Sequence, residues 1–203
     1  MPTARSSAGR DAAIVALIGV VLYAAIDVVL QFLPPYYSPI RDAESDLAVG
    51  PFGWVQTINY LGRGVTCAFA IVAIASGTRT GRRRTVGLLF FGVTGLCGAL
   101  VAFFPTDVVA GGQAVTVHGH VHVVAATVGF TCALAAFWIL RHLVKTRLTD
   151  AFLLIATVGL VFLAVTVVGV PALFGLAERI SLVGILGWIF VTCLRIRLGK
   201  RLS

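Results

Sequence analysis

Long apolar runs alternate with short polar segments along the whole chain. Each run is close to the about 20 residues that a helix needs to cross the hydrocarbon core of a bilayer. Inside such a core every backbone N–H and C=O group must bond within its own segment, which makes a helix the expected structure. The pattern therefore predicts an all-α integral membrane bundle of six transmembrane helices. The expected helices cover about residues 12–33, 54–77, 85–105, 118–140, 151–173 and 179–195.

The composition agrees with a protein that has lipid as its solvent. Of the 203 residues, 59% are hydrophobic and 12% are charged, whereas soluble domains carry about a quarter charged residues. Six spans with short loops use the whole length, so residues 1–203 are expected to form a single transmembrane domain. Arg5 and Arg10 precede the first run as in a signal peptide, but the run continues to Leu33, and we expect it to be retained.

The basic residues cluster in alternate loops. A net charge of +8 would suit nucleic acid, but this clustering indicates membrane topology instead, because loops rich in Lys and Arg stay in the cytoplasm. Both termini are therefore expected inside, in a multi-pass protein of the cell membrane. The opposite, outer loops hold only Arg41 and Arg179 among the basic residues, together with several acids. The inner basic residues are Arg5, Arg10, Arg79, Arg82, Arg83, Arg84, Arg141, Lys145, Arg147, Arg195, Arg197, Lys200 and Arg201, and the outer acids are Asp42, Glu44, Asp46, Asp107 and Glu178.

Two charged side chains lie well away from the ends of the expected spans, Asp27 in the first and Arg63 in the second. A charge at mid-bilayer costs at least about 2.5 kcal/mol, so such residues normally face the interior of a bundle. Their depths, both in the outer half, allow the two to pair. One interpretation is a site with acid–base groups, and the other is a hydrogen-bonded network that only fixes helix packing. Each residue belongs to a polar face with helical spacing, made of Tyr23, Asp27 and Gln31 on the first helix and Gln56, Asn59, Tyr60 and Arg63 on the second.

A candidate zinc site lies where the fourth helix begins. His118 and His122 are four residues apart, which places both imidazoles on one helical face. Catalytic zinc needs three protein ligands, so a third would come from Asp107, Glu178 or the acidic first loop. The other interpretation is a pair of interfacial histidines that contact water and lipid head groups. Zinc is the only cofactor that the sequence suggests, because it contains no nucleotide-binding glycine motif and no histidine pair suited to haem.

The sixth helix is expected to begin beside Glu178, Arg179 and Ser181. An acid in a first helical turn complements the helix dipole, so Glu178 has either a structural role there or one as a general acid or base. Arg179 gains nothing from that dipole, and we expect it to neutralise an acid or to hold an anionic head group.

Several short motifs resemble the DUF998 family of prokaryotic six-helix membrane proteins. They are a Ser45-Asp46 loop before Gly53-Trp54, Phe104-Pro105-Thr106-Asp107, His118 to His122, Gly175-Leu176-Ala177-Glu178-Arg179, and Trp188. The start of the fourth helix is also distantly similar to the Frag1/DRAM membrane proteins. The resemblance implies six helices and a shared site on the outer side. The family has no established reaction, so the resemblance supplies no substrate.

These observations lead to a hypothesis of one polar cavity in the outer half of the bundle. It would suit an enzyme that modifies a lipid or isoprenoid by acid–base or metal chemistry. The alternatives are a small-molecule or proton-coupled transporter and a noncatalytic scaffold or sensor. The expected partners are membrane lipid and a lipid or hydrophobic small-molecule substrate, and no nucleic acid. The candidate catalytic residues are Asp27, Arg63, Asp107, His118, His122 and Glu178; the candidate substrate-binding residues are Tyr23, Asn59, Tyr60, Arg179 and Ser181; the candidate metal ligands are Asp107, His118 and His122.

Overall fold

The computed structural model describes residues 7–108 and 115–199. Within these ranges the chain contains α-helices and no strand, which confirms the predicted all-α class. Six α-helices follow one another in the described ranges, and two short 3₁₀ helices lie in the connecting segments. The α-helices are α1 (Ser7–Leu30), α2 (Gly53–Gly77), α3 (Arg82–Leu100), α4 (Val117–Val144), α5 (Arg147–Val168) and α6 (Phe174–Arg197), and the 3₁₀ helices are η1 (Glu44–Ala48) and η2 (Pro171–Leu173).

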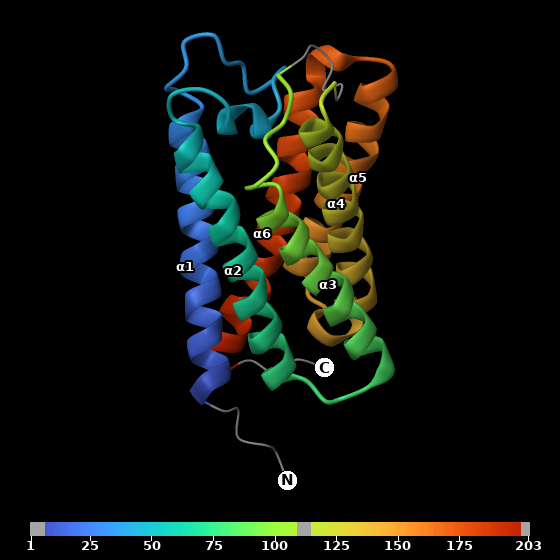
Figure 1. Ribbon diagram of the computed structural model, residues 1–203. Coiled ribbons are helices and arrows are strands. Elements are labelled where there is room, and N and C mark those ends of the chain that lie inside the picture. Colours follow the sequence, from blue (N-terminus) through green and yellow to red (C-terminus); the bar gives the residue numbers. More distant parts are fainter. Residues whose placement is uncertain (1–6, 109–114, 200–203) are drawn as a thin grey trace.

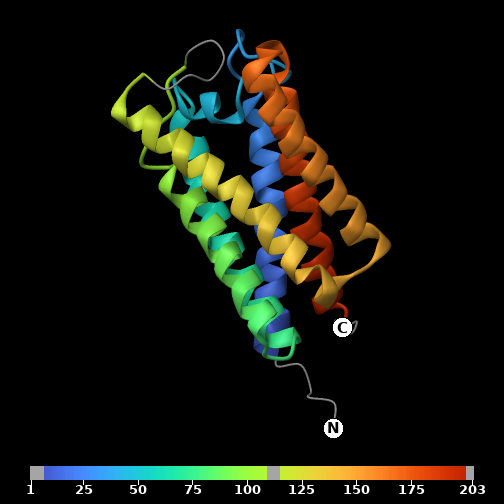
Figure 2. The same cartoon turned by 90° about the vertical axis from the view of Figure 1, so that its right-hand side faces the viewer.

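The helices form an up-and-down ring (Figures 1 and 2). Each helix contacts the next along the chain, and α6 closes the ring against α1. Helix α1 begins and α6 ends at the same end of the bundle. We call this the inner end, after the expected topology, and the opposite end, where the α1–α2 connection lies, the outer end. The contact between α4 and α5 is much slighter than those between α3 and α4 or between α5 and α6, so the ring has a seam there.

Five of the described helical segments are long and apolar enough to cross a membrane. They are α1, α2, α4, α5 and the segment of η2 and α6. The chain is therefore of the multi-pass membrane protein type. Helix α3 has only 19 residues and opens on Arg82, Arg83 and Arg84, which shortens its apolar part. It nevertheless packs against α2 and α4 in the ring. A crossing by α3 and a cytoplasmic position of both termini stay predictions.

The two helices nearest the C-terminus have different bounds from the predicted 151–173 and 179–195. Helix α5 begins at Arg147, because the Thr146 hydroxyl accepts a hydrogen bond from Thr149 N at 3.0 Å and caps its first turn. It ends at Val168, ahead of Pro171, a residue that cannot continue a helix. Pro171 instead opens η2, and α6 follows directly, ahead of the predicted start.

The bounds of the earlier helices also differ from those of the apolar runs that predicted them. Helix α1 starts at Ser7 and α4 continues to Val144, because polar residues at their inner ends also adopt helical structure. Helix α3 ends at Leu100 rather than at 105, and residues 101–104 form turns before Pro105. Apolar character thus located each helix, while caps and prolines determined where it stops.

Apolar side chains fill the middle and the inner half of the bundle. Trp188 of α6 stacks on Phe137 of α4 with ring centroids 3.9 Å apart, and Phe91 of α3 meets Phe137 edge-on at 5.5 Å. All three side chains are fully buried. Small residues let backbones approach, since a Cβ added at Gly184 would lie 2.2 Å from the backbone N of Ala156 on α5. This core holds the helices beneath the polar outer end.

Candidate functional site

The connection between α1 and α2 folds back over the outer end of the bundle (Figure 1). Arg179 of α6 holds it there, because its Nη1 donates to the backbone carbonyls of Pro39 at 3.0 Å and Asp42 at 3.1 Å. Its Nη2 donates to the Tyr37 hydroxyl, and the guanidinium lies 5.5 Å from the centre of the Tyr37 ring. The sequence suggested that Arg179 neutralises an acid or holds an anionic head group. The structure places its Nη groups on the chain's own loop.

Glu44 of η1 is the centre of the polar network at the outer end. It is 2% exposed, and its Oε1 accepts hydrogen bonds from the Tyr23 hydroxyl and, at 2.7 Å, from Gln56 Nε2. Its backbone N–H donates to Glu178 Oε2 at 2.6 Å. One loop residue therefore joins α1, α2 and α6. From the sequence Glu44 is expected only as an outer acid, because a single acid in a loop has the pattern of a solvated residue.

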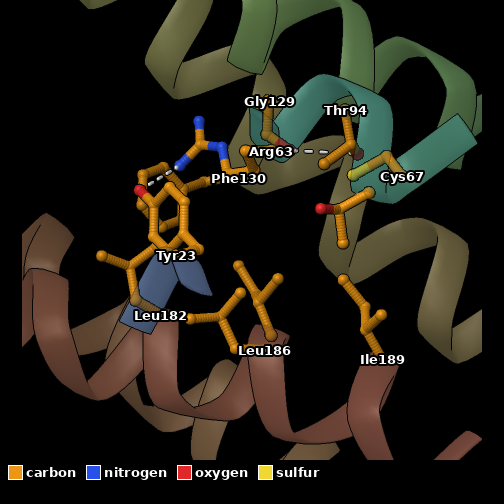
Figure 3. A pocket seen from close by; sticks show the side chains of 11 residues that line it. Tyr23, Arg63, Cys67, Thr94, Gly129, Phe130, Leu182, Leu186 and Ile189 are labelled. Atoms are coloured by element: carbon orange, nitrogen blue, oxygen red, sulfur yellow. Dashed lines mark hydrogen bonds between the residues drawn. The ribbon is translucent and has the colours of Figure 1, made fainter. Parts of the chain in front are cut away.

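Arg63 contacts this network through Tyr23. Its Nη1 donates to the Tyr23 hydroxyl at 3.2 Å, and its guanidinium carbon lies 5.6 Å from the ring centres of both Tyr23 and Tyr60. Figure 3 shows this contact beside a cavity of about 30 Å³, which is large enough for a buried water. The positive charge of Arg63 thus reaches Glu44 through one hydroxyl group.

Asp27 does not form an ion pair with Arg63, although their depths allowed one. The ion pairs within the described part of the chain are Arg41–Asp42 and Arg141–Asp150. Asp27 Oδ2 instead accepts a hydrogen bond from Gln31 Nε2 at 2.7 Å, one turn further along the same helix, while its buried Oδ1 has no partner. Helical spacing places residues at equal depth but does not fix how two helices are rotated against each other.

The other candidate substrate-binding residues on α1, α2 and α6 bond within the bundle. Asn59 Nδ2 donates to the Tyr23 carbonyl at 3.2 Å and to Gln56 Oε1 at 3.3 Å. Tyr60 is 2% exposed and packs beside Tyr23. Ser181 is fully buried and donates to the Ala177 carbonyl of its own helix at 3.2 Å. These side chains stabilise helix packing and lie away from any large cavity.

Asp107 fastens the start of α4. Its carboxylate accepts hydrogen bonds from Val115 N at 2.7 Å, Thr116 N at 2.8 Å and Thr116 Oγ1 at 2.9 Å. Thr116 in turn caps α4 by accepting from Gly119 N at 3.0 Å. The hydrogen bonds from the Thr116 and Val115 backbones lower the pKa of Asp107, so the carboxylate stays ionised.

The two histidines of the candidate zinc site have different surroundings. His118 is exposed, with its ring edge-on to Phe104 at 5.6 Å. His122 is 4% exposed, and its Nδ1 lies 2.7 Å from the Phe104 carbonyl. Among the described residues, no three His, Cys, Asp or Glu side chains are placed to hold a metal ion together. The candidate ligand set Asp107, His118 and His122 therefore does not assemble, because the Asp107 carboxylate is directed at the backbone of 115–116.

A groove of about 490 Å³ lies at the seam between α4 and α5, open on the side of the bundle. Its walls are mostly apolar side chains of these two helices and Phe174, with two threonines of α4 among them. Its outer end carries Glu178, His122 and Asp46, with Ser45 and Thr106 beside them. Of the six candidate catalytic residues, the structure places His122 and Glu178 on the groove. The wall residues are Val123, Ala126, Thr127, Phe130, Thr131, Leu160, Leu163, Ala164 and Val167.

Asp46, which the sequence marks only as an outer acid and as part of the Ser45-Asp46 motif, has an unusual environment on this groove. Its Oδ2 accepts a hydrogen bond from Ala43 N at 3.2 Å. Burial, together with the nearby charge of Asp42, raises the pKa of Asp46 to about 6. The carboxyl group is therefore ionised at neutral pH, but burial and the charge of Asp42 make its ionised form less stable than it would be in water.

Replacing Asp46 by asparagine should stabilise the protein more at about pH 8 than at about pH 4. Because the folded pKa of Asp46, about 6, lies above the ordinary value of 3.8, the favourable contribution of its neutral form is present below about pH 4 and is lost as pH rises through about 6. Asparagine stays neutral throughout. The measurement is the difference in melting temperature between Asp46→Asn and the parent in detergent, with Asp11→Asn as a control for an exposed acid. A difference that is the same at both pH values would contradict the assigned environment.

A comparison with protein families agrees with the resemblance read from the motifs. The model of the family described as "Protein of unknown function (DUF998)" matches residues 17–195, which cover nearly all of the helical bundle. Neither a curated protein nor a solved structure matches the chain. The expected similarity to the Frag1/DRAM proteins stays a prediction.

Proposed function

We propose that this chain, which belongs to the DUF998 family, is a membrane enzyme that modifies the polar head of a lipid or isoprenoid held in the α4–α5 groove. The observation that carries the proposal is a groove of about 490 Å³ with apolar walls and an ionisable outer end. Sites for small ligands are typically apolar clefts of about 300–1,000 Å³ with a few polar groups that fix orientation. The alkyl chain of a lipid in the groove would lie among side chains as apolar as the bilayer.

The motifs on which the family resemblance rests support the same location. The Ser45-Asp46 loop, the segment containing Thr106, the histidine segment and the segment containing Glu178 each contribute a side chain to the groove. These residues come from separate parts of the sequence and meet only in the folded chain. Trp188 and the Gly53-Trp54 pair do not line the groove, since Trp188 lies in the apolar core and Gly53-Trp54 begin α2.

His122 and Glu178 are suited to acid–base chemistry at a bound head group. The Phe104 carbonyl can only accept a hydrogen bond, so His122 Nδ1 carries a proton, and in the neutral imidazole Nε2 is then the acceptor. Glu178 is 7% exposed, and its Oε2 is held by Glu44 N–H, while no side chain or backbone group of the described residues bonds to its Oε1. A carboxyl group that is held at one oxygen and lines the same groove as an imidazole can accept and return a proton.

A transport function receives less support from the same structure. The buried Glu44, His122 and Glu178 all lie toward the outer end of the described chain. The inner half is packed with apolar side chains around Phe137 and Trp188, and a carrier needs a path for its substrate or proton to the other face. A scaffold function would need the polar network but would have no use for a groove that opens toward lipid.

Filling the groove should prevent lipid from entering it. Ala126 lines the groove, and Ala126→Phe would place a ring between its walls. We expect labelling by a photoreactive alkyl lipid in reconstituted vesicles to fall about tenfold, the equivalent of about 1.4 kcal/mol of binding free energy. The matched control is Ala68→Phe, at an exposed position of α2 outside the groove. Equal labelling of both variants would disprove lipid binding at this site.

The enzyme hypothesis has a separate test in Glu178→Gln. The variant keeps the shape of the side chain and an acceptor for Glu44 N–H but cannot exchange a proton. Lipid extracts of cells that produce the parent should lose one species and gain another, compared with extracts of cells that produce the variant. Identical extracts, with groove labelling intact, would leave a lipid-binding protein without catalysis.

A further inference from the structure

A second cavity, here called the outer cavity, lies beside the groove at the outer end. It has a volume of about 630 Å³ and is bordered by the α1–α2 connection and η2. Its lining includes Tyr36, Arg41 and Asp42. Three residues, Ala43, Asp46 and Phe174, line both the outer cavity and the groove. These residues form a shared wall between a space on the outer face and a space on the side of the bundle.

Acidic side chains outnumber basic ones among the residues that line the two cavities. Arg41 is already paired with Asp42, since Arg41 Nε lies 2.7 Å from Asp42 Oδ1. Asp46 and Glu178 line the groove without a cation among its other lining residues. Arg179 adds positive charge behind the wall, but it lines neither cavity, and its Nη groups bond to the loop. His122 directs its Nδ1 at the Phe104 carbonyl rather than at the acids of the wall.

We propose that the groove and the outer cavity take one ligand, a single-chain amphiphile with a cationic ammonium head. The alkyl chain of the ligand lies between α4 and α5, and its head lies at the shared wall near Asp46 and Glu178. This inference rests on the proposed function, because it uses the same groove and names the class of its ligand. A cationic head neutralises the carboxylate of Asp46, whose charge is otherwise costly beside an apolar groove. The aromatic rings of Tyr36 and Phe174 suit an ammonium group as well, because aromatic faces attract cations.

Two photoreactive probes with the same alkyl chain test this inference. One carries a trimethylammonium head and the other a hydroxyl head, and each is added at equal mole fraction to the protein in maltoside micelles. Intact mass spectrometry then measures covalent labelling of the groove. We expect the ammonium probe to label the parent about tenfold more than the hydroxyl probe, a ratio equivalent to about 1.4 kcal/mol.

The variant Asp46→Asn should remove most of this preference. Asparagine keeps an oxygen for the hydrogen bond from Ala43 N, so the η1 segment is expected to fold as before. The control Asp11→Asn changes an exposed acid at the inner end of α1 and should keep the preference. Equal labelling by both probes, or a preference that survives Asp46→Asn, would overturn the inference.

The outcomes separate this inference from the proposed function. If both probes label the parent equally and Ala126→Phe abolishes the labelling, the groove binds lipid but does not prefer a cationic head. Labelling that is insensitive to Ala126→Phe would reject both. Native mass spectrometry of the purified protein identifies the source of the ligand: a co-purifying amine lipid indicates a membrane component, and binding of the added probe to a protein free of such lipid indicates a cation taken up from outside.

Discussion

Replacing Glu44 by alanine is expected to destabilise the protein by about 2–5 kcal/mol, because a buried donor left without an acceptor costs about 1–3 kcal/mol. The Tyr23 hydroxyl and Gln56 Nε2 both donate to Glu44 Oε1, and both lie where water has little access. The change also leaves Arg63, which bonds to Tyr23, without a nearby carboxylate in the network. Unfolding in mixed micelles with increasing denaturing detergent measures the loss.

Two control variants separate the lost hydrogen bonds from the lost charge. Glu44→Gln keeps an acceptor oxygen in the same place and should cause a clearly smaller loss than Glu44→Ala. Asp150→Ala removes an acid whose ion pair with Arg141 lies near the surface, where such pairs contribute little. If Glu44→Ala is no more destabilising than Asp150→Ala, then Glu44 is not the centre of a buried network.

Replacing Trp188 by alanine is expected to cost about 3–5 kcal/mol, the usual range for removing a large aromatic side chain from a packed interior. Trp188 is fully buried and stacks on Phe137 at 3.9 Å, and Phe137 in turn contacts Phe91. The cavity left behind would separate α4 from α6. The same unfolding measurement gives the free energy, and near-ultraviolet circular dichroism should show the loss of the stacked ring.

Trp54 is the matched control for this change. Its side chain is 65% exposed at the outer end of α2, so Trp54→Ala should leave the free energy of unfolding almost unchanged in the same micelles. Trp188→Phe keeps an aromatic ring against Phe137 and should recover part of the stability. Similar losses in Trp188→Ala and Trp54→Ala would refute the central packing role of the stacked pair.

Some of the candidate site could be predicted from helical spacing alone. The spacing indicated that Tyr23 and the polar residues of the second helix share inward faces, and the structure buries Gln56, Asn59 and Tyr60. Spacing was less informative for His118 and His122. They share a face, but His118 lies in the first turn of α4 and is exposed, whereas His122 lies one turn deeper beside Phe104.

The residues of the groove could not be predicted because they depend on how separate segments meet. Asp46 lies in a loop rich in proline. It comes against α4 and α6 because Arg179, Glu178 and the backbone N–H groups at the start of α6 bond to that loop. Glu44 is buried for the same reason. A loop acid carries no periodic signal, so its burial depends on contacts between residues far apart in the chain, such as the hydrogen bond between Glu44 N and Glu178.

The sequence by itself determined that the chain is an all-α protein of membrane type and which faces of its helices are polar. Those properties follow from local composition, because a long apolar run has one stable structure in lipid and a helix repeats every 3.6 residues. Only the tertiary structure decided which polar groups meet. Helix rotation separated Asp27 from Arg63, the folded loop buried Glu44, and the slight contact between α4 and α5 opened the groove that reaches Glu178.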